Sequence, residues 1–218
     1  MKQLINEEDS TFSRSIEKSI TYLKSVDPIL EQVIINTKRP SFSPHTDYYW
    51  ALVDSIISQQ LSVKSAAAIE KRFRQLFNEE VPEPKHILEK TVDELKSVGL
   101  SRPKALYILD LAGHIESGKL TFEHFNSASN FEIISELTDV KGIGVWTTHM
   151  FLIFCMGRLD VLAIGDYGIR AGIKNLYGFE EMPTPNEVSV LSKRNKWHPY
   201  ESVACWYIWQ SIDNKPSV

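Results

Sequence analysis

A pair of glycines separated by one residue limits the fold of this chain more than any other feature. Gly142 and Gly144 stand in the stretch Val-Lys-Gly-Ile-Gly at residues 140–144. Glycine adopts positive φ angles at little steric cost, so this pattern predicts a tight hairpin between two helices. The apolar run at residues 150–154 follows and would anchor the hairpin in a core. Backbone amides exposed by such a turn are suited to binding an anion such as phosphate.

Helical signals run through the rest of the chain. Ser62 and Ser101 suit helix N-caps, and Thr-Val-Asp-Glu at residues 91–94 is a capping-box pattern that starts a short helix ending at Gly99. No stretch alternates between apolar and polar residues over a useful length, which argues against a β-rich or α/β fold. We therefore predict an all-α fold. The main helices are expected at about residues 11–25, 27–36, 47–57, 62–77, 101–118 and 131–137, and loops at the proline-containing stretches 82–84 and 183–185.

Composition is that of an ordinary soluble globular protein. Of the 218 residues, 43% are hydrophobic and 24% charged, and no apolar run approaches the roughly 20 residues of a membrane span. The N-terminus is acidic where a signal peptide would be apolar. Cys155 and Cys205 stand among bulky apolar neighbours, so they are expected to be buried free thiols in a reducing compartment.

Net charge argues mildly against a nucleic-acid partner. The formal charge is −4 and the isoelectric point about 5.9, whereas phosphate-binding domains are usually basic. Basic residues nevertheless cluster at 71–72, 102–104 and 193–196. Because charge clusters are usually solvated surface, they do not identify a binding face by themselves.

One carboxylate could work together with the glycine hairpin. Asp166 follows Gly144 by 22 residues, in a Gly-Asp-Tyr-Gly setting, and could lie near whatever the hairpin binds. A phosphate-binding hairpin and one acid indicate chemistry on nucleic acid. Structural interpretations remain open, since the glycines also suit a plain helix–helix turn and an aspartate at a helix start is most often an N-cap. Trp146 and Trp209 could equally be core residues.

Four segments, in the expected order, resemble the helix-hairpin-helix DNA glycosylases. Residues 137–148 are similar to the hairpin of that family, and residues 160–170 to the segment that carries its essential aspartate. Two more segments, 57–67 and 197–209, resemble the 3-methyladenine DNA glycosylase II branch, which repairs alkylated DNA. The resemblance spans roughly residues 45–212.

The resemblance implies a two-lobed helical fold with a DNA-binding cleft between the lobes. One lobe would be a bundle of about residues 45–150 that ends in the hairpin. The other would join residues 1–44 to residues 151–218.

The resemblance also implies roles for individual residues. Asp166 matches the carboxylate that stabilises positive charge at C1′ of a flipped nucleotide and orients or deprotonates the attacking water. Lys141, Gly142 and Gly144 match the hairpin that holds phosphates beside the lesion, where backbone carbonyls can also hold a monovalent cation; no other cofactor is expected. Gln60 matches the wedge that fills the gap left by the extruded base, and the more apolar Leu61 could share that role.

The base pocket is expected to be aromatic. Trp209 matches one wall of the pocket, Trp146 stands at the start of the second hairpin helix, and Met150 replaces an aromatic residue found in some members. A purine alkylated at N3 or N7 is cationic and already a good leaving group, so one carboxylate would suffice where glycoside hydrolysis usually needs two. Its electron-poor ring would stack favourably on tryptophan.

Two further features refine the expected activity. Trp146 stands where strand-cutting relatives carry a lysine that forms a Schiff base, so a monofunctional enzyme that leaves an abasic site is expected. Two cysteines 50 residues apart cannot form the four-cysteine iron–sulfur loop of some relatives.

The sequence thus predicts a monomeric glycosylase acting on 3-methyladenine, and on related lesions such as 7-methylguanine, in duplex DNA. It would work without a membrane, in bacterial cytoplasm or a eukaryotic nucleus. Two alternatives remain open: a glycosylase of the same superfamily for oxidised, deaminated or mismatched bases, and a module that binds damaged DNA without catalysis.

Overall fold

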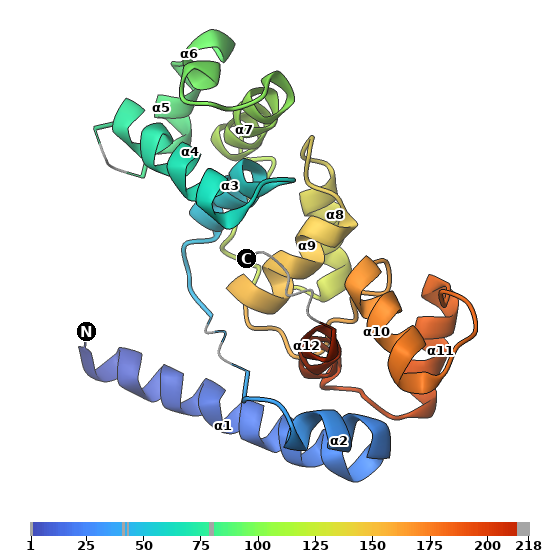
Figure 1. Ribbon diagram of the computed structural model, residues 1–218. Helices are drawn as coiled ribbons and strands as arrows, with labels where there is room; N and C mark the ends of the chain where they lie inside the picture. The colour runs from blue at the N-terminus through green and yellow to red at the C-terminus, as the bar shows by residue number, and fades with distance from the viewer. Residues whose placement is uncertain (1, 41, 43, 79–80, 213–218) are drawn as a thin grey trace. The chain divides into compact units, whose positions relative to one another are not determined.

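Helices make up all the regular structure in the described part of the chain (Figure 1). The computed structural model describes residues 2–40, 42, 44–78 and 81–212. The helices are α1 (Lys2–Val26), α2 (Pro28–Ile35), α3 (Tyr48–Ser58), α4 (Val63–Leu76), α5 (Pro84–Leu88), α6 (Val92–Ser97), α7 (Arg102–Glu116), α8 (Asn130–Thr138), α9 (Val145–Met150), the π-helix η1 (Phe151–Cys155), α10 (Tyr167–Tyr177), α11 (Pro185–Arg194) and α12 (Glu201–Ser211). The predicted all-α fold is confirmed.

Local capping explains where most of these helices begin. Ser62 and Ser101 are the N-caps of α4 and α7, and each side-chain oxygen accepts a hydrogen bond from the backbone amide three residues on. Thr91 and Glu94 form the predicted capping box at the start of α6. These starts depend on neighbours in the sequence alone, which is why the pattern predicted them.

Two helices were missed because both begin with a proline. The stretches at 82–84 and 183–185 were predicted as loops, but Pro84 and Pro185 each start a helix, α5 and α11. Proline suits the first position of a helix because its missing N–H would have no partner there. At α11 the start is reinforced by a capping box between Thr184 and Glu187.

The chain forms two compact units. One consists of the chain up to His45 together with the chain from Leu152, and the other is Thr46–Phe151. Residues 213–218, which belong to the second predicted lobe, lie outside the described residues.

A buried carboxylate organises the first unit. Asp27 is 1% exposed, and its Oδ1 caps α2 by accepting from two backbone amides at 3.0 Å. Its Oδ2 accepts from the hydroxyl of Tyr177 at 2.6 Å, the amide of Asn195 at 2.8 Å and the indole N–H of Trp197 at 2.7 Å. Burial and the Asp27 carboxylate raise the pKa of Tyr177, so this phenol stays a donor. The N-terminal helices are thereby joined to the C-terminal ones.

Close helix packing completes that unit. Gly172 of α10 meets α12, where an added Cβ would lie 2.5 Å from Cγ2 of Ile208 and 3.0 Å from its carbonyl oxygen. Only glycine allows this approach of the two helices.

The second unit is built around buried faces of α3, α7 and α8. Leu52, Ile56, Ile108 and Ile133 are fully buried there. Tyr48 adds an aromatic cluster with Phe122, Phe125 and Phe151, with ring centroids 5.6–6.2 Å from that of Tyr48.

Two expectations about the whole chain can be compared with the described residues. Cys155 and Cys205 are both free and buried, as predicted. Among the described helices, none combines the length and the apolar character that crossing a membrane requires.

Candidate functional site

Asp166 caps a helix and also contacts a tryptophan. It is the N-cap of α10, and its Oδ1 accepts from the backbone amide of Ile169 at 2.8 Å. The same oxygen accepts from Nε1 of Trp209 at 2.8 Å, and the residue is only 8% exposed. The N-cap interpretation is therefore correct. It does not exclude a chemical role, because two donors fix the orientation of a largely buried carboxylate.

Trp209 lies directly behind this carboxylate. It is 2% exposed, and its ring stacks on Phe154 with centroids 5.8 Å apart. Gly168 makes room for the contact: a Cβ there would lie 3.0 Å from Cδ1 of Trp209 and 3.1 Å from Oδ1 of Asp166. Gly168 was not among the predicted site residues, although it belongs to the Gly-Asp-Tyr-Gly setting. In this structure Trp209 orients Asp166; its expected role as a pocket wall stays a prediction.

The thiol next to this site is inert. Burial raises the pKa of Cys205 to about 12, with smaller contributions from the charges of Asp166 and Glu201. A nucleophilic cysteine must be a thiolate, so Cys205 is a neutral packing residue at ordinary pH. Cys205 is therefore not a candidate for covalent chemistry beside Asp166.

The hairpin has the predicted form, and its two glycines have different reasons to be glycine. Gly142 has φ +86°, and a Cβ there would overlap the ring of Tyr107 on α7. Gly144 is the N-cap of α9 with φ −98°, and a Cβ there would meet nothing within 4 Å. The first glycine is needed for folding, whereas the second keeps the outer surface of the turn bare.

Lys141 at the tip of the hairpin contacts α7. Its backbone N–H donates to Oδ2 of Asp110 at 2.9 Å, and its ammonium lies 3.2 Å from Oδ1. Burial alone would raise the pKa of Asp110, but the amide and ammonium of Lys141 hold it below its usual range. The side chain of Lys141 is 77% exposed, so its charge can still be reached from solvent.

The segment that carries the predicted wedge lies against the hairpin. Gln60 is exposed with φ +57°, and Leu61 is half-buried. The neighbouring Gln59 donates from Nε2 to the carbonyl oxygen of Gly142 at 2.9 Å. Lys104 of α7 donates to the carbonyl oxygens of Ile57 and Gln59 at 2.7 and 2.6 Å. Neither contact was predicted from the sequence, because each joins residues far apart in the chain.

The two remaining predicted pocket residues lie on α9, directly after the hairpin. Trp146, in its first turn, is 46% exposed, and Met150, at its end, is 9% exposed. Trp146 thus offers ring surface to a partner, while Met150 belongs mainly to the core.

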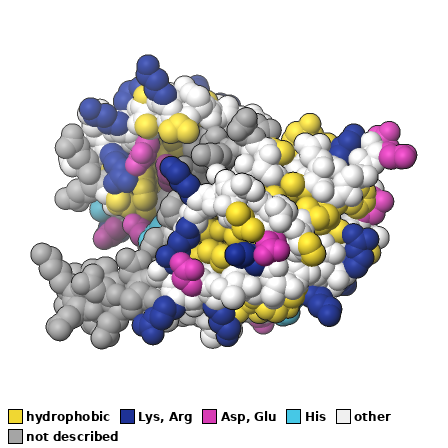
Figure 2. Space-filling view, turned by 60° about the horizontal axis from the view of Figure 1, so that its bottom comes forward, with side chains coloured by type: hydrophobic (Ala, Val, Ile, Leu, Met, Phe, Trp, Pro, Cys, Tyr) yellow, Lys and Arg dark blue, Asp and Glu magenta, His cyan; other side chains and the backbone are white. Residues whose placement is uncertain are grey.

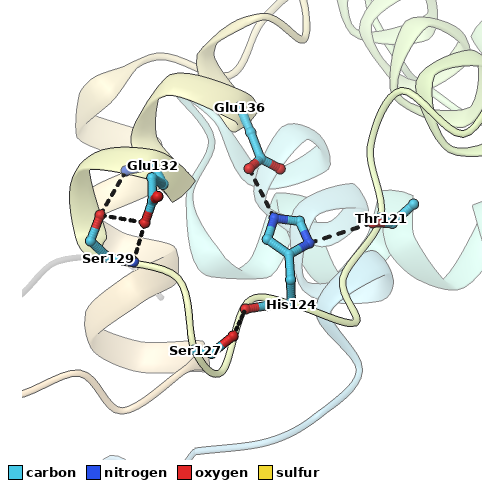
Figure 3. A network of polar contacts seen from close by, with 6 residues as sticks. All are labelled: Thr121, His124, Ser127, Ser129, Glu132 and Glu136. Carbon is cyan, nitrogen blue, oxygen red and sulfur yellow. Dashed lines mark hydrogen bonds and ion pairs between the residues drawn. The ribbon is translucent and has the colours of Figure 1, made fainter.

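Side-chain contacts also fix the first hairpin helix, α8. Figure 3 shows Ser129 and Glu132 forming a capping box at its start, while Nε2 of His124 from the preceding loop lies 2.9 Å from Oε1 of Glu136 within the helix. Ser127 closes the loop by donating to the carbonyl oxygen of His124 at 3.0 Å. The helix that leads into the hairpin is therefore held at its start and in its last turn.

The hairpin carbonyl oxygens of Gly142 and Gly144, near which a monovalent cation is predicted, already accept hydrogen bonds from protein donors. That of Gly142 accepts from Gln59, and that of Gly144 accepts from the amide and hydroxyl of Thr148 at 3.0 and 3.1 Å. A carbonyl oxygen has two lone pairs, so the bond from Gln59 leaves one lone pair of the Gly142 oxygen unused. The cation itself stays a prediction. In the described residues, no cluster of three His, Cys, Asp or Glu side chains offers a different metal site.

Comparison with known proteins identifies the family. Residues 53–197 match the family described as HhH-GPD superfamily base excision DNA repair protein. The chain belongs to this family. The predicted family relationship is confirmed, and the match covers α8, the hairpin, α9 and the Asp166 segment.

Relatives of this HhH-GPD protein align along most of its length. It is 31% identical to DNA-3-methyladenine glycosylase 1 of Schizosaccharomyces pombe, over 94% of this chain and 91% of the relative. Among solved structures, DNA-3-methyladenine glycosidase from Bacillus halodurans has a TM-score of 0.79 at 36% identity, covering 88% of each chain. The S. pombe enzyme Mag1 in complex with abasic DNA has a TM-score of 0.76 at 32% identity, covering 88% of this chain and 95% of that one.

One face of this HhH-GPD protein carries charges of both signs. Figure 2 shows Lys and Arg side chains spread over the face that it draws, with Asp and Glu side chains among them. The net charge of the whole chain is −4.

Proposed function

We propose that this chain is a monofunctional DNA glycosylase that hydrolyses the N-glycosidic bond of alkylated purines in duplex DNA, acting as a monomer and leaving an abasic site. The names of its relatives support 3-methyladenine as the substrate. We extend the proposal to 7-methylguanine, because alkylation at N7 also makes the purine cationic.

The geometry of Asp166 is the observation that carries the proposal. Its carboxylate is 8% exposed and is oriented by two hydrogen bonds at 2.8 Å, from Ile169 and Trp209. A fixed negative charge with little solvent around it stabilises positive charge effectively. Beside C1′ of a flipped nucleotide, it would stabilise the oxocarbenium-like transition state and orient the attacking water.

The leaving group explains why a single acid suffices. A purine alkylated at N3 or N7 leaves as a neutral base when the bond from C1′ to nitrogen breaks, so it needs no protonation. The water adds to C1′ and gives up a proton, for which Asp166 is the acceptor. The inert thiol of Cys205 fits hydrolysis without a covalent cysteine intermediate.

The hairpin and the turn before α4 would handle the DNA. Amides around Gly142 and Gly144, with the exposed ammonium of Lys141, would bind phosphates beside the lesion, with a monovalent cation on the hairpin carbonyls adding positive charge. Gln60, assisted by Leu61, would enter the stack and fill the space of the extruded base.

Strand cleavage is not part of the proposal. Trp146 stands at the position of the Schiff-base lysine of strand-cutting relatives, and an indole cannot form that bond. With its exposed ring, and with Met150 behind it, Trp146 would instead contact the substrate. If borohydride traps a covalent adduct between the protein and DNA, the proposal of a monofunctional enzyme is wrong.

The test compares wild type with Asp166→Asn on methylated duplex DNA, with the released bases separated by chromatography. Asparagine is an equally good N-cap and keeps an oxygen for Trp209, so the fold should be retained. Loss of the charge should slow release by at least about 100-fold, the loss typical of a key electrostatic group. Full activity of the variant would exclude Asp166. If wild type releases a damaged base other than an alkylated purine, the proposed substrate is wrong. If it binds DNA but forms no abasic product, the proposed catalysis is wrong.

A further inference from the structure

Helix α7 contacts the two segments of its unit that are proposed to bind DNA, the hairpin at residues 140–144 and the turn at residues 59–62. Lys104, Tyr107 and Asp110 follow one another at intervals of three residues and so share one stripe of the helix. The first of them bonds to the end of α3, directly before the predicted wedge. The other two meet the hairpin, at Gly142 and Lys141 respectively.

Lys104 fixes the end of α3 through two short bonds. Its ammonium lies 2.7 Å from the carbonyl oxygen of Ile57 and 2.6 Å from that of Gln59. The last carbonyls of a helix lack partners within the helix, and a cation there also interacts favourably with the helix dipole. A charged donor on the carbonyl oxygens of Ile57 and of the C-cap Gln59, on either side of Ser58, sets the direction in which the chain leaves α3.

Gln59 connects that exit to the hairpin. Its side chain donates to the carbonyl oxygen of Gly142 at 2.9 Å, while its own carbonyl oxygen is held by Lys104. Gln60, the next residue, has φ +57°, a conformation that costs free energy for a side chain other than glycine. Contacts of Gln59 on one side, and the bond from the Leu61 amide to the carbonyl oxygen of Ser58 at 3.1 Å on the other, offset this cost.

A wedge is effective only at a fixed distance from the phosphates that are held beside it. We propose that α7 sets this distance, and that Lys104 and Gln59 are positioning residues that hold the Gln60 turn against the hairpin during base extrusion. This proposal rests on the proposed function, since it assumes that Gln60 enters the stack. Neither residue touches the reacting atoms.

The test uses Lys104→Met and Gln59→Leu, which remove the donors and keep side chains of similar length. Lys119→Met, an exposed lysine just after α7, is the matched control for charge, and Gln75→Leu on α4 is the control for the amide. Single-turnover release is measured on two duplexes that carry one 7-methylguanine, either paired with cytosine or opposite thymine. A mismatched base flips more easily, so it depends less on the wedge.

Lys104→Met and Gln59→Leu should each lower the single-turnover rate of base release about tenfold or more on the paired duplex. The decrease should be clearly smaller on the mismatched duplex. The two control variants should match wild type on both duplexes. Equal slowing on both duplexes would indicate a purely structural role and would overturn the proposal, as would no slowing on either.

Amide hydrogen exchange in the free protein separates this proposal from the proposed function. Residues 59–62 and 140–144 should exchange faster in both positioning variants than in wild type, and unchanged exchange would overturn the proposal whatever the activity. If wild type releases no base from either duplex, the proposed function fails for this substrate while the exchange result still decides whether the contacts hold the turn.

Discussion

At the scale of single residues, Gly142 and Gly144 show how two glycines of one motif serve different purposes. Gly142→Ala should destabilise the protein by about 2 kcal/mol or more, because φ is +86° and the new methyl group would overlap the ring of Tyr107. Gly144→Ala should change the free energy of unfolding by less than about 0.5 kcal/mol, since its φ is −98° and the added Cβ meets nothing. Chemical denaturation measures both.

The affinity of Gly144→Ala for duplex DNA tests whether the bare surface at Gly144 has a role in binding. If the bare surface at Gly144 lets a phosphate approach the hairpin, Gly144→Ala should weaken binding to duplex DNA without loss of stability. Wild-type affinity in this stable variant would show that the hairpin does not approach the backbone closely at that position.

At the scale of elements, the contact between α7 and the hairpin should depend on pH. The pKa of Asp110 is lower in the folded protein than in the unfolded chain, where it is about 3.9. A depressed pKa adds stability that is present above the unfolded value and is lost as the pH falls through the folded one. Asp110→Asn keeps an acceptor for the amide of Lys141 but removes this charge. At pH 7 the variant should therefore be less stable by about 1 kcal/mol.

The pH series distinguishes charge from shape. Unfolding free energies of wild type and Asp110→Asn should begin to converge as the pH falls below about 4, where Asp110 is protonated in the unfolded chain but still charged in the folded protein. A difference that stays constant from pH 7 to pH 3 would assign the loss to packing instead.

The elements also show what a sequence reveals and what it hides. The starts of α4, α6 and α7 depend on a hydroxyl and an amide three residues apart, so local pattern predicted them. The starts of α5 and α11 each carry a proline, which looks the same in a turn, so the prediction of loops there is wrong even though Thr184 and Glu187 form a capping box at the start of α11.

At the scale of the whole molecule, the contacts that orient the candidate site join residues far apart in the chain. The hydrogen bond from Gln59 to Gly142 spans 83 residues, and that from Trp209 to Asp166 spans 43. Local periodicity carries no information on such pairs, because they arise only when packing brings helices together. Pattern and resemblance could therefore predict Asp166 and the hairpin glycines, but not Lys104, Gln59 or Asp110, whose significance lies in what they contact.

Net charge belongs to this scale as well, and it determines how the chain should bind DNA. With a net charge of −4, non-specific attraction to DNA is expected to be weak. The logarithm of the association constant should then fall only gently with the logarithm of salt concentration, by about 0.9 per phosphate neutralised. Lys141, exposed at the hairpin tip, is the strongest candidate for such a contact.

Fluorescence anisotropy of labelled duplex DNA over a salt series tests this. Lys141→Met should reduce the slope by about 0.9, whereas Lys119→Met, an equal loss of charge, should leave it unchanged. A wild-type slope for Lys141→Met would mean that its ammonium stays with Asp110 in the complex. The hairpin would then have to bind phosphate through its backbone amides alone, and the exposed charge of Lys141 would serve only to hold the turn on α7.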